Sequence, residues 1–224
     1  MSVGLNTECE NCEAKKHCYP EGGNLVGFEH MDIHYAKGDM IFKQGTIAPH
    51  VLFLKEGLVK IFLEHENQRQ TICLEKEGFI GLESMYADQH FQYSVMALTD
   101  VKVCLIEINE FQQQVLDNGN LGAALITDLN KRSHYLYQRI IALTRKQAHG
   151  RIADIMLCLS DRIFESDQFT IPCKQKELAD MAAISPESLS RILKDFKEDG
   201  VVSLSGKNVT VLNRQKLEMI SKVS

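Results

Sequence analysis

The first half of the chain alternates short apolar runs with single glycines. Within residues 25–111 these runs are rich in β-branched and aromatic side chains, and they are separated by Gly38, Gly45, Gly57 and Gly78. The clearest runs cover residues 41–42, 51–54, 58–63, 71–74 and 101–106. Frequent glycine turns between such runs are typical of antiparallel barrels and sandwiches. We therefore predict an antiparallel β-barrel in this half of the chain.

The hydrophobic period becomes helical after residue 118. Between residues 121 and 148 the chain holds no proline and a single glycine, and apolar positions recur at alternating spacings of four and three. The predicted dimer seam on this line consists of Ile126, Leu129, Leu136, Ile140 and Leu143, together with Gly122 and Ser133. Such a heptad seam favours a dimeric coiled coil over the wider stripe of a helix that lies on its own domain. Leu121 and Leu125 form a second apolar line, which we expect to face the barrel.

The last part of the chain, residues 149–224, combines short helical patterns with a terminal hairpin. Residues 174–182 form an amphipathic pattern, and Ser185 followed by Pro186 is a typical start for the next helix, because serine caps it and proline has no N–H to leave unpaired. The apolar side of that second helix consists of Leu189, Ile192, Leu193 and Phe196. Residues 201–212 then form a hairpin pattern. Helix, three-residue turn, helix and β-wing predict a winged helix-turn-helix.

These patterns divide the chain into four parts and place it in the α+β class. We predict an N-terminal arm that contains cysteines over residues 1–24 and a β-barrel sensor domain over 25–118. A long dimerisation helix follows over 119–148, and a winged helix-turn-helix domain occupies 149–224.

Composition and charge are those of a globular chain with a slightly basic end. Of the 224 residues, 44% are apolar and 25% are charged, which excludes a wholly disordered chain. No run approaches the roughly 18 apolar residues of a membrane helix, and we expect no signal peptide, no membrane contact and a cytoplasmic location. Residues 144–224 carry 13 Lys and Arg against 11 Asp and Glu, whereas the remaining residues carry 12 against 19. Any contact with DNA must therefore be made locally, by the C-terminal part.

Three motifs occur in a characteristic order. Residues 37–45 (KGDMIFKQG) and 78–81 (GFIG) lie in the predicted barrel, 150–153 (GRIA) follow the long helix, and 187–193 (ESLSRIL) lie in the second helix of the helix-turn-helix. From about residue 37 to residue 212 the chain resembles the Crp/Fnr family of bacterial transcription regulators. The resemblance implies a jelly-roll barrel of the cyclic-nucleotide-binding type. It also implies a homodimer whose N-terminal half binds an effector that controls sequence-specific DNA binding, with RNA polymerase as a further partner.

The second helix of the predicted motif carries a polar face suited to a DNA major groove. Glu187, Ser190 and Arg191 share the side opposite the apolar one. Arginine can bind guanine with two hydrogen bonds, and glutamate can accept one from cytosine. The alternative is a solvated face with an i,i+4 ion pair between Glu187 and Arg191. The trio resembles the base-reading residues of the FNR subgroup, which implies palindromic double-stranded DNA with TTGAT-like half-sites. The candidate phosphate contacts are Lys174, Lys176, Lys194, Lys197 and Lys207.

The predicted barrel lacks the residues with which related regulators bind cAMP. Family members that sense cAMP hold its phosphate with an arginine next to a serine, but the corresponding residues 91–96 here are FQYSVM. No Lys or Arg occurs between Lys76 and Lys102, and Leu136 and Tyr137 stand where the hydroxyl pair for the adenine is expected. Because a buried phosphodiester without a cation is costly, we do not expect cAMP to bind.

Four of the seven cysteines resemble the ligands of an iron–sulfur cluster. Cys9, Cys12 and Cys18 have the spacing C-x2-C-x5-C, and Cys104 lies on the last predicted barrel strand. The oxygen-sensing FNR subgroup uses three N-terminal cysteines at this spacing and one from that strand, so the resemblance implies a 4Fe–4S cluster. Such a cluster would sense oxygen, nitric oxide or redox state.

Other interpretations of the N-terminal half remain open. The arm cysteines together with His17 could bind zinc, or the arm could hold no ligand. Cys104 could be an ordinary packed thiol, which is the usual role of a single strand cysteine. Haem or another small molecule could bind in the barrel. The other cysteines, Cys73, Cys158 and Cys173, are interpreted as packed thiols.

An enzyme is the alternative from a different class of protein. A cupin-like barrel could use His30 and His34 as metal ligands, but no third histidine or glutamate follows at a suitable spacing. The chain also lacks nucleophile–base, P-loop and dinucleotide-binding motifs. We therefore predict a regulator and not an enzyme.

Overall fold

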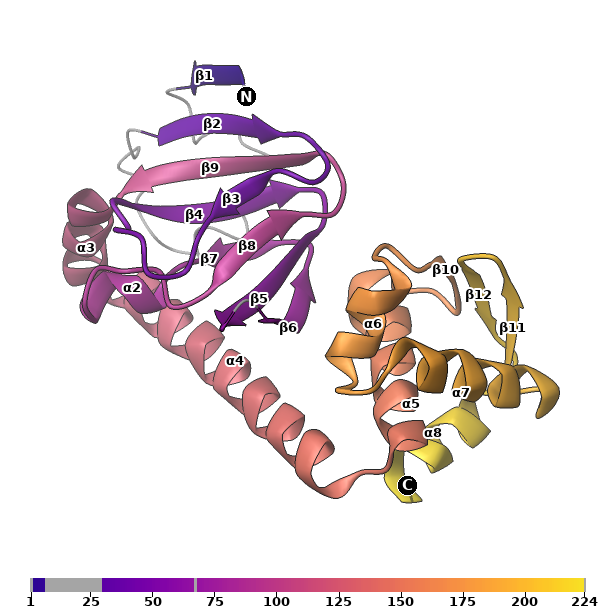
Figure 1. Cartoon of the computed structure of the whole chain (residues 1–224). Helices are drawn as coiled ribbons and strands as arrows, with labels where there is room; N and C mark the ends of the chain where they lie inside the picture. Colours follow the sequence, from indigo (N-terminus) through magenta and orange to yellow (C-terminus); the bar gives the residue numbers. More distant parts are fainter. Residues whose placement is uncertain (1, 7–29, 67, 224) are drawn as a thin grey trace. The chain divides into compact units, whose positions relative to one another are not determined.

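The computed structural model describes residues 2–6, 30–66 and 68–223 (Figure 1). The residues Cys9, Cys12, Cys18 and His17 lie outside this described part. The chain divides into two units, of which the first ends at Arg132 and the second begins at Ser133. The long helix α4, Gly119–Arg145, contributes residues to both units.

The first unit contains two antiparallel sheets. The larger sheet has the order β1 (Ser2–Asn6), β2 (His30–Tyr35), β9 (Val101–Glu107), β4 (His50–Glu56) and β7 (Gly78–Ile80). The smaller sheet has the order β3 (Met40–Phe42), β8 (Ser94–Ala97), β5 (Val59–His65) and β6 (Gln68–Glu75). The α+β, jelly-roll-like fold is confirmed, but the two sheets do not close into a barrel, because each keeps its own edge strands.

The glycine between β4 and β5 has a structural reason. Gly57 has φ +95°, a conformation that costs other residues free energy, and a Cβ at this position would collide with the backbone carbonyl of Asp100. The turn therefore depends on a residue without a side chain.

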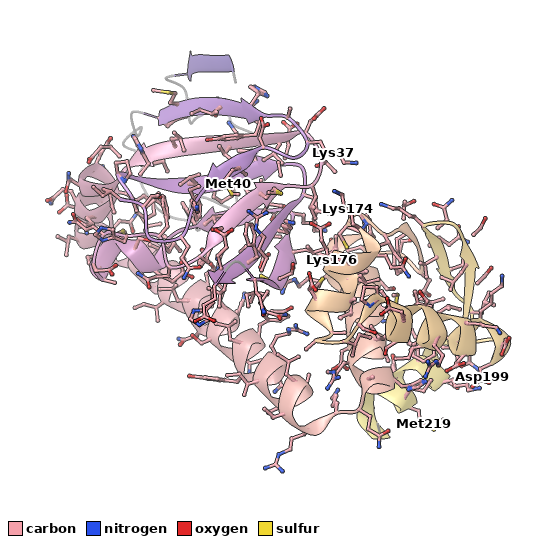
Figure 2. All side chains as sticks on the ribbon, in the orientation of Figure 1. Lys37, Met40, Lys174, Lys176, Asp199 and Met219 are labelled. Atoms are coloured by element: carbon pink, nitrogen blue, oxygen red, sulfur yellow. The ribbon has the colours of Figure 1, made fainter. Side chains whose placement is uncertain are left out.

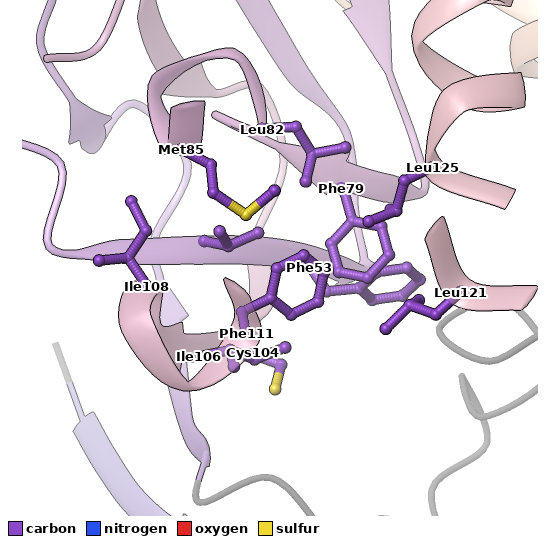
Figure 3. Close-up of a cluster of buried hydrophobic side chains, with 11 residues drawn as sticks. Phe53, Phe79, Leu82, Met85, Cys104, Ile106, Ile108, Phe111, Leu121 and Leu125 are labelled. Carbon is purple, nitrogen blue, oxygen red and sulfur yellow. The ribbon is translucent and has the colours of Figure 1, made fainter. Parts of the chain in front are cut away.

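A cluster of aromatic and aliphatic side chains joins the larger sheet to the helices of this unit (Figure 3). The rings of Phe53 and Phe79 meet edge to face with their centroids 4.9 Å apart, and Phe111 from α3 (Ile108–Asp117) lies 5.2 Å from Phe79. The short helix α2 (Glu83–Tyr86) adds Met85. Leu121 and Leu125 complete the cluster, so the expectation that this line of the long helix faces the sheet domain is confirmed.

The other apolar line of α4 is largely uncovered. Ile126, Leu136 and Ile140 are 62%, 45% and 57% exposed. Leu129 packs partly against the cluster of its own unit, and Leu143 is half-buried. The helix ends at Arg145, three residues before the predicted end, and the next helix begins at Ala148.

The second unit is a winged helix-turn-helix. Its elements are α5 (Ala148–Cys158), the π-helical turn Leu159–Ile163, β10 (Gln168–Thr170), α6 (Gln175–Met181), α7 (Pro186–Glu198), β11 (Val202–Ser205), β12 (Asn208–Val211) and α8 (Arg214–Val223). The wing hairpin β11–β12 gains β10 as a third strand. On α7, Leu189, Ile192 and Phe196 are buried as predicted, whereas Leu193 is half-buried.

Helix α8 was not expected from the sequence. It is capped by Asn213, whose side chain accepts a hydrogen bond from the backbone N–H of Lys216 at 2.9 Å, and it buries Leu217 completely. An asparagine cap followed by one fully buried leucine is a weak signal in a short, mostly polar segment. Within the described residues, every helix is too short or too polar to span a bilayer.

Candidate nucleic-acid interface

The second helix of the motif, α7, begins at a well-formed cap. The Ser185 hydroxyl accepts a hydrogen bond from the backbone N–H of Ser188 at 3.2 Å, and Pro186 occupies the first helical position. Both features were predicted. They start the helix at a defined residue and thereby determine which side chains lie on its buried side and which point outward.

The three predicted base-reading residues lie on the outward side of α7. Glu187, Ser190 and Arg191 are all exposed. A hydrogen bond from the Ser185 side chain, supported by the backbone N–H of Glu187 itself, lowers the pKa of the Glu187 carboxyl, which is therefore an ionised acceptor at neutral pH. Among the described residues no ion pair or hydrogen bond holds the Arg191 guanidinium, so the alternative Glu187–Arg191 pair is not formed.

Ser190 is held by a residue that the sequence did not single out. The side-chain amide of Gln175, the first residue of α6, donates to the Ser190 hydroxyl at 2.5 Å. The same hydroxyl donates to the backbone carbonyl of Pro186 at 2.9 Å. The sequence offers no local signal for this contact, because the two residues are 15 positions apart on different helices.

The candidate phosphate contacts are exposed lysines on three elements. Figure 2 labels two of them, Lys174 and Lys176. Lys174 is the N-cap residue of α6, and Lys176 is the second residue of that helix. Lys194 lies 3.5 Å from Glu198 in an exposed i,i+4 pair, which contributes little to stability. The ammonium of Lys207, in the wing turn, donates to the backbone carbonyl of Cys173 at 3.0 Å. This bond connects the wing to the segment before α6 and leaves the ammonium with further donors.

The end of α4 is hydrogen-bonded to the domain that carries α7. The Arg139 guanidinium donates to the backbone carbonyl of Met181, at the C-terminal end of α6. Lys146 forms an ion pair with Asp154 of α5 at 2.7 Å, and its ammonium also donates to Ser221 of α8 at 3.3 Å. The helix-turn-helix is therefore attached through polar contacts to the helix that precedes it.

A polar network lies in the first unit around Tyr93, within the segment 91–96 on which the expectation about cAMP rests. The Tyr93 hydroxyl accepts from the backbone N–H of Gly81 at 2.9 Å and donates to the Glu83 carboxylate at 3.0 Å. Burial, and next the Glu83 charge, raise the pKa of Tyr93 far above its ordinary range. Tyr93 is therefore a neutral donor at this position.

Arg132 brings a cation to this network from the long helix. Its guanidinium donates to the Phe79 carbonyl and pairs with Asp128 at 2.9 Å, and its charge acts on both Tyr93 and Glu83. The strand segment itself has no Lys or Arg, as the sequence indicated, but the fold supplies one. The absence of a cation along the strands is therefore not a sufficient argument against an anionic ligand.

A second group of interest lies on β2 and β9. His30, Asp32 and Cys104 are 6–7% exposed, and their potential ligand atoms all lie within 4.8 Å of one another. The Asp32 carboxylate forms an ion pair with Lys55 at 3.0 Å and lies 3.7 Å from Lys102. The buried negative charge thus has nearby positive partners. His34, proposed as a partner of His30 in the cupin-like alternative, is exposed and does not belong to this group.

Two domain families match the chain. The cyclic nucleotide-binding domain matches residues 32–118, and the Crp-like helix-turn-helix domain matches residues 150–220. The chain is 25% identical to transcriptional activator protein Anr of Pseudomonas protegens, over 92% of this chain and 88% of the relative. It is 22% identical to the fumarate and nitrate reduction regulatory protein of Vibrio cholerae, over 100% of this chain and 94% of the relative. The solved structure of FixK2 from Bradyrhizobium japonicum has a TM-score of 0.79 at 19% identity, and the match covers 87% of this chain and 98% of that one.

A cyclic nucleotide-binding-like domain, a long helix and a helix-turn-helix, in this order, define a class of two-domain transcription regulators. With relatives that match over nearly the whole length, the chain belongs to the Crp/Fnr family. This family consists of transcriptional regulators and not of enzymes, so the cupin-like alternative is wrong.

Proposed function

We propose that this regulator reads palindromic DNA with TTGAT-like half-sites through Glu187, Ser190 and Arg191. The observation that carries the proposal is their common position, exposed on the side of α7 opposite its buried apolar residues. An ionised carboxylate accepts hydrogen bonds from base amino groups, and an unpaired guanidinium can bind guanine with two hydrogen bonds. The five exposed lysines supply phosphate contacts, which position the domain on the duplex without reading its sequence. RNA polymerase is proposed as a further partner of the bound regulator.

The protein acts in this proposal as a homodimer, with a second copy covering the exposed line of α4. Ile126, Leu136 and Ile140 are large apolar side chains at heptad spacing, and their exposure leaves them available to an identical helix. Two copies related by a two-fold axis place two recognition helices on the two halves of a palindrome.

The proposed effector site is an iron–sulfur cluster held by Cys9, Cys12, Cys18 and Cys104. The name of the Vibrio cholerae relative refers to fumarate and nitrate reduction, which supports a redox signal. The strand register also supports the ligand set. Residue Gly4 of β1 pairs with Asp32 of β2, and Asp32 pairs with Cys104 of β9, so β1 lies one strand away from the cysteine.

The length of chain after β1 is compatible with this ligand set. Asn6 pairs with His30, and Cys9 follows Asn6 by three residues, which can span at most about 10 Å. A thiol on β9 therefore fits as the fourth ligand of a cluster whose other ligands follow β1. When bound, the cluster would supply oxygen- and redox-sensitive chemistry, since such clusters are held by thiolates and respond to their surroundings. Zinc in the arm and a haem or small molecule in the first unit are the competing occupants.

Arg191→Ala tests the DNA-reading proposal. We expect it to weaken binding to the specific palindrome by about 1–3 kcal/mol, with little effect on random DNA, because a base contact contributes only where its base is present. The measurement is a titration of both duplexes at one salt concentration. Lys197→Ala, on the same helix, is the matched control and should weaken both complexes alike. Equal losses on both duplexes for Arg191→Ala would make it a phosphate contact and would contradict the proposal.

A further inference from the structure

The hydrogen bond between α6 and α7 has consequences for which bases can be read. Gln175 and Ser190 are both exposed, on the same surface as Glu187 and Arg191. The Gln175 amide nitrogen lies 2.5 Å from the Ser190 hydroxyl oxygen, and this oxygen lies 2.9 Å from the Pro186 carbonyl. The hydroxyl thus has two protein partners before any DNA is bound.

The direction of both hydrogen bonds follows from the groups involved. A serine hydroxyl has one proton, and a backbone carbonyl can only accept. The hydroxyl proton is therefore directed to Pro186, and the Gln175 amide must be the donor to the oxygen. With its proton committed and one lone pair occupied, Ser190 can offer the groove only an acceptor.

We propose that Gln175 is a specificity-determining positioning residue that acts through Ser190. Because Ser190 is kept as an acceptor, it favours, as the base whose edge it faces in the major groove, one that presents an amino group, which is adenine (N6) or cytosine (N4). It disfavours an edge that presents only acceptors, such as guanine N7 and O6. This inference rests on the proposed DNA-reading function of α7, and it adds a residue from α6 to the reading surface.

The start of α6 is well suited to hold this side chain in place. The backbone N–H of Lys174 donates to the Glu177 carboxylate at 2.8 Å, which ties the residue before the helix to its first turn. Gln175 is the first residue inside that turn and lies between Lys174 and Lys176. It has no charge, so unlike its two neighbours it cannot contribute a counterion-release term to DNA binding.

The experiment compares Gln175→Met with Lys176→Met, because methionine preserves side-chain length and helix preference at both positions. Each variant, and the wild type, is titrated with a palindromic duplex series in which every base pair of the half-site is replaced in turn. We expect Gln175→Met to lower discrimination at one base pair by about two- to tenfold, the effect of one neutral hydrogen bond. Lys176→Met should weaken binding to every duplex alike and should reduce the salt dependence.

Ser190→Ala and the double variant Gln175→Met/Ser190→Ala test whether Gln175 acts through Ser190. Ser190→Ala should lower discrimination at the same base pair. The double variant should lose no more discrimination than the more affected single variant, because the two residues act as one unit. Relaxation at a different base pair, a uniform loss with a smaller salt slope, or no change for Gln175→Met would each overturn the inference. A wild-type protein without any sequence preference would instead contradict the proposed function, so the two failures are distinguishable.

Discussion

A single serine at the start of α7 has two roles. The Ser185 hydroxyl accepts from the Ser188 backbone and also bonds to the Glu187 carboxylate, whose pKa it lowers. The residue that begins the helix therefore also lowers the pKa of a proposed base-reading residue. Cap and reading surface overlap because the N-terminal turn is both the part of a helix that needs caps and the part that enters a groove.

Ser185→Ala should destabilise the winged helix-turn-helix by about 1 kcal/mol, because the N–H of Ser188 loses its acceptor. Urea unfolding of the C-terminal unit, followed by the helical circular dichroism signal, measures the change. Ser188→Ala is the matched control, since it keeps the backbone N–H that is capped and should cost much less. Equal stability of Ser185→Ala and the wild type would show that the cap contributes nothing.

At the scale of elements, α4 carries two apolar lines with different roles. Leu121 and Leu125 are buried against the sheet domain, whereas Leu136 and Ile140 are exposed. The same helix also connects to both units by polar contacts, through Arg132 to Phe79 and through Arg139 to Met181. A change in the position of this helix would therefore alter hydrogen bonds in each unit.

Leu136→Glu should shift the protein from dimer toward monomer, because a glutamate in the seam would bury unpaired charge. Sedimentation equilibrium over a range of protein concentrations measures this shift. Tyr137→Glu is the control, since Tyr137 is adjacent, 63% exposed and off the heptad line. It should leave the dimer intact. An unchanged dimer for Leu136→Glu would place the interface on another surface.

At the scale of the whole molecule, the proposal connects a sensor in the first unit with a DNA-reading helix in the second. The described part of the sensor contributes Cys104, and the register of β1, β2 and β9 connects the start of the arm to it. Asp32 and His30 lie close to the same thiol. If this thiol binds metal as proposed, such neighbours influence the affinity of the site for the metal and the reactivity of the bound metal.

Protein purified without oxygen should be brown, absorb near ~400 nm and contain about four irons per chain, as expected of a thiolate-bound 4Fe–4S cluster. Metal analysis and absorption spectra measure both. Cys104→Ser should lose colour and iron, whereas Cys73→Ser, at an equally buried cysteine on β6, should retain them. Colourless protein with zinc would support the zinc alternative, and colourless protein without metal would leave the arm without a ligand; either result contradicts the cluster.

The order of elements could be predicted from the sequence because its signals are local. Glycines between β-branched runs indicate strands, the four-residue spacing of Leu121 and Leu125 indicates a shared helix face, and Ser185 with Pro186 indicates where α7 begins. The open arrangement of the two sheets and helix α8 did not follow from these signals, because strand closure depends on pairing between distant segments and α8 has little apolar surface.

The contacts between side chains that are distant along the chain could not be predicted from the sequence. Gln175 bonds to Ser190, Arg132 reaches Phe79 from another element, and Asp32 lies between two lysines. These pairs have no characteristic spacing along the chain, because packing of whole elements brings them together. Local sequence signals were therefore enough for the class of protein and for the position of the proposed reading helix, whereas the hydrogen bonds that orient its side chains depend on the packing of distant elements.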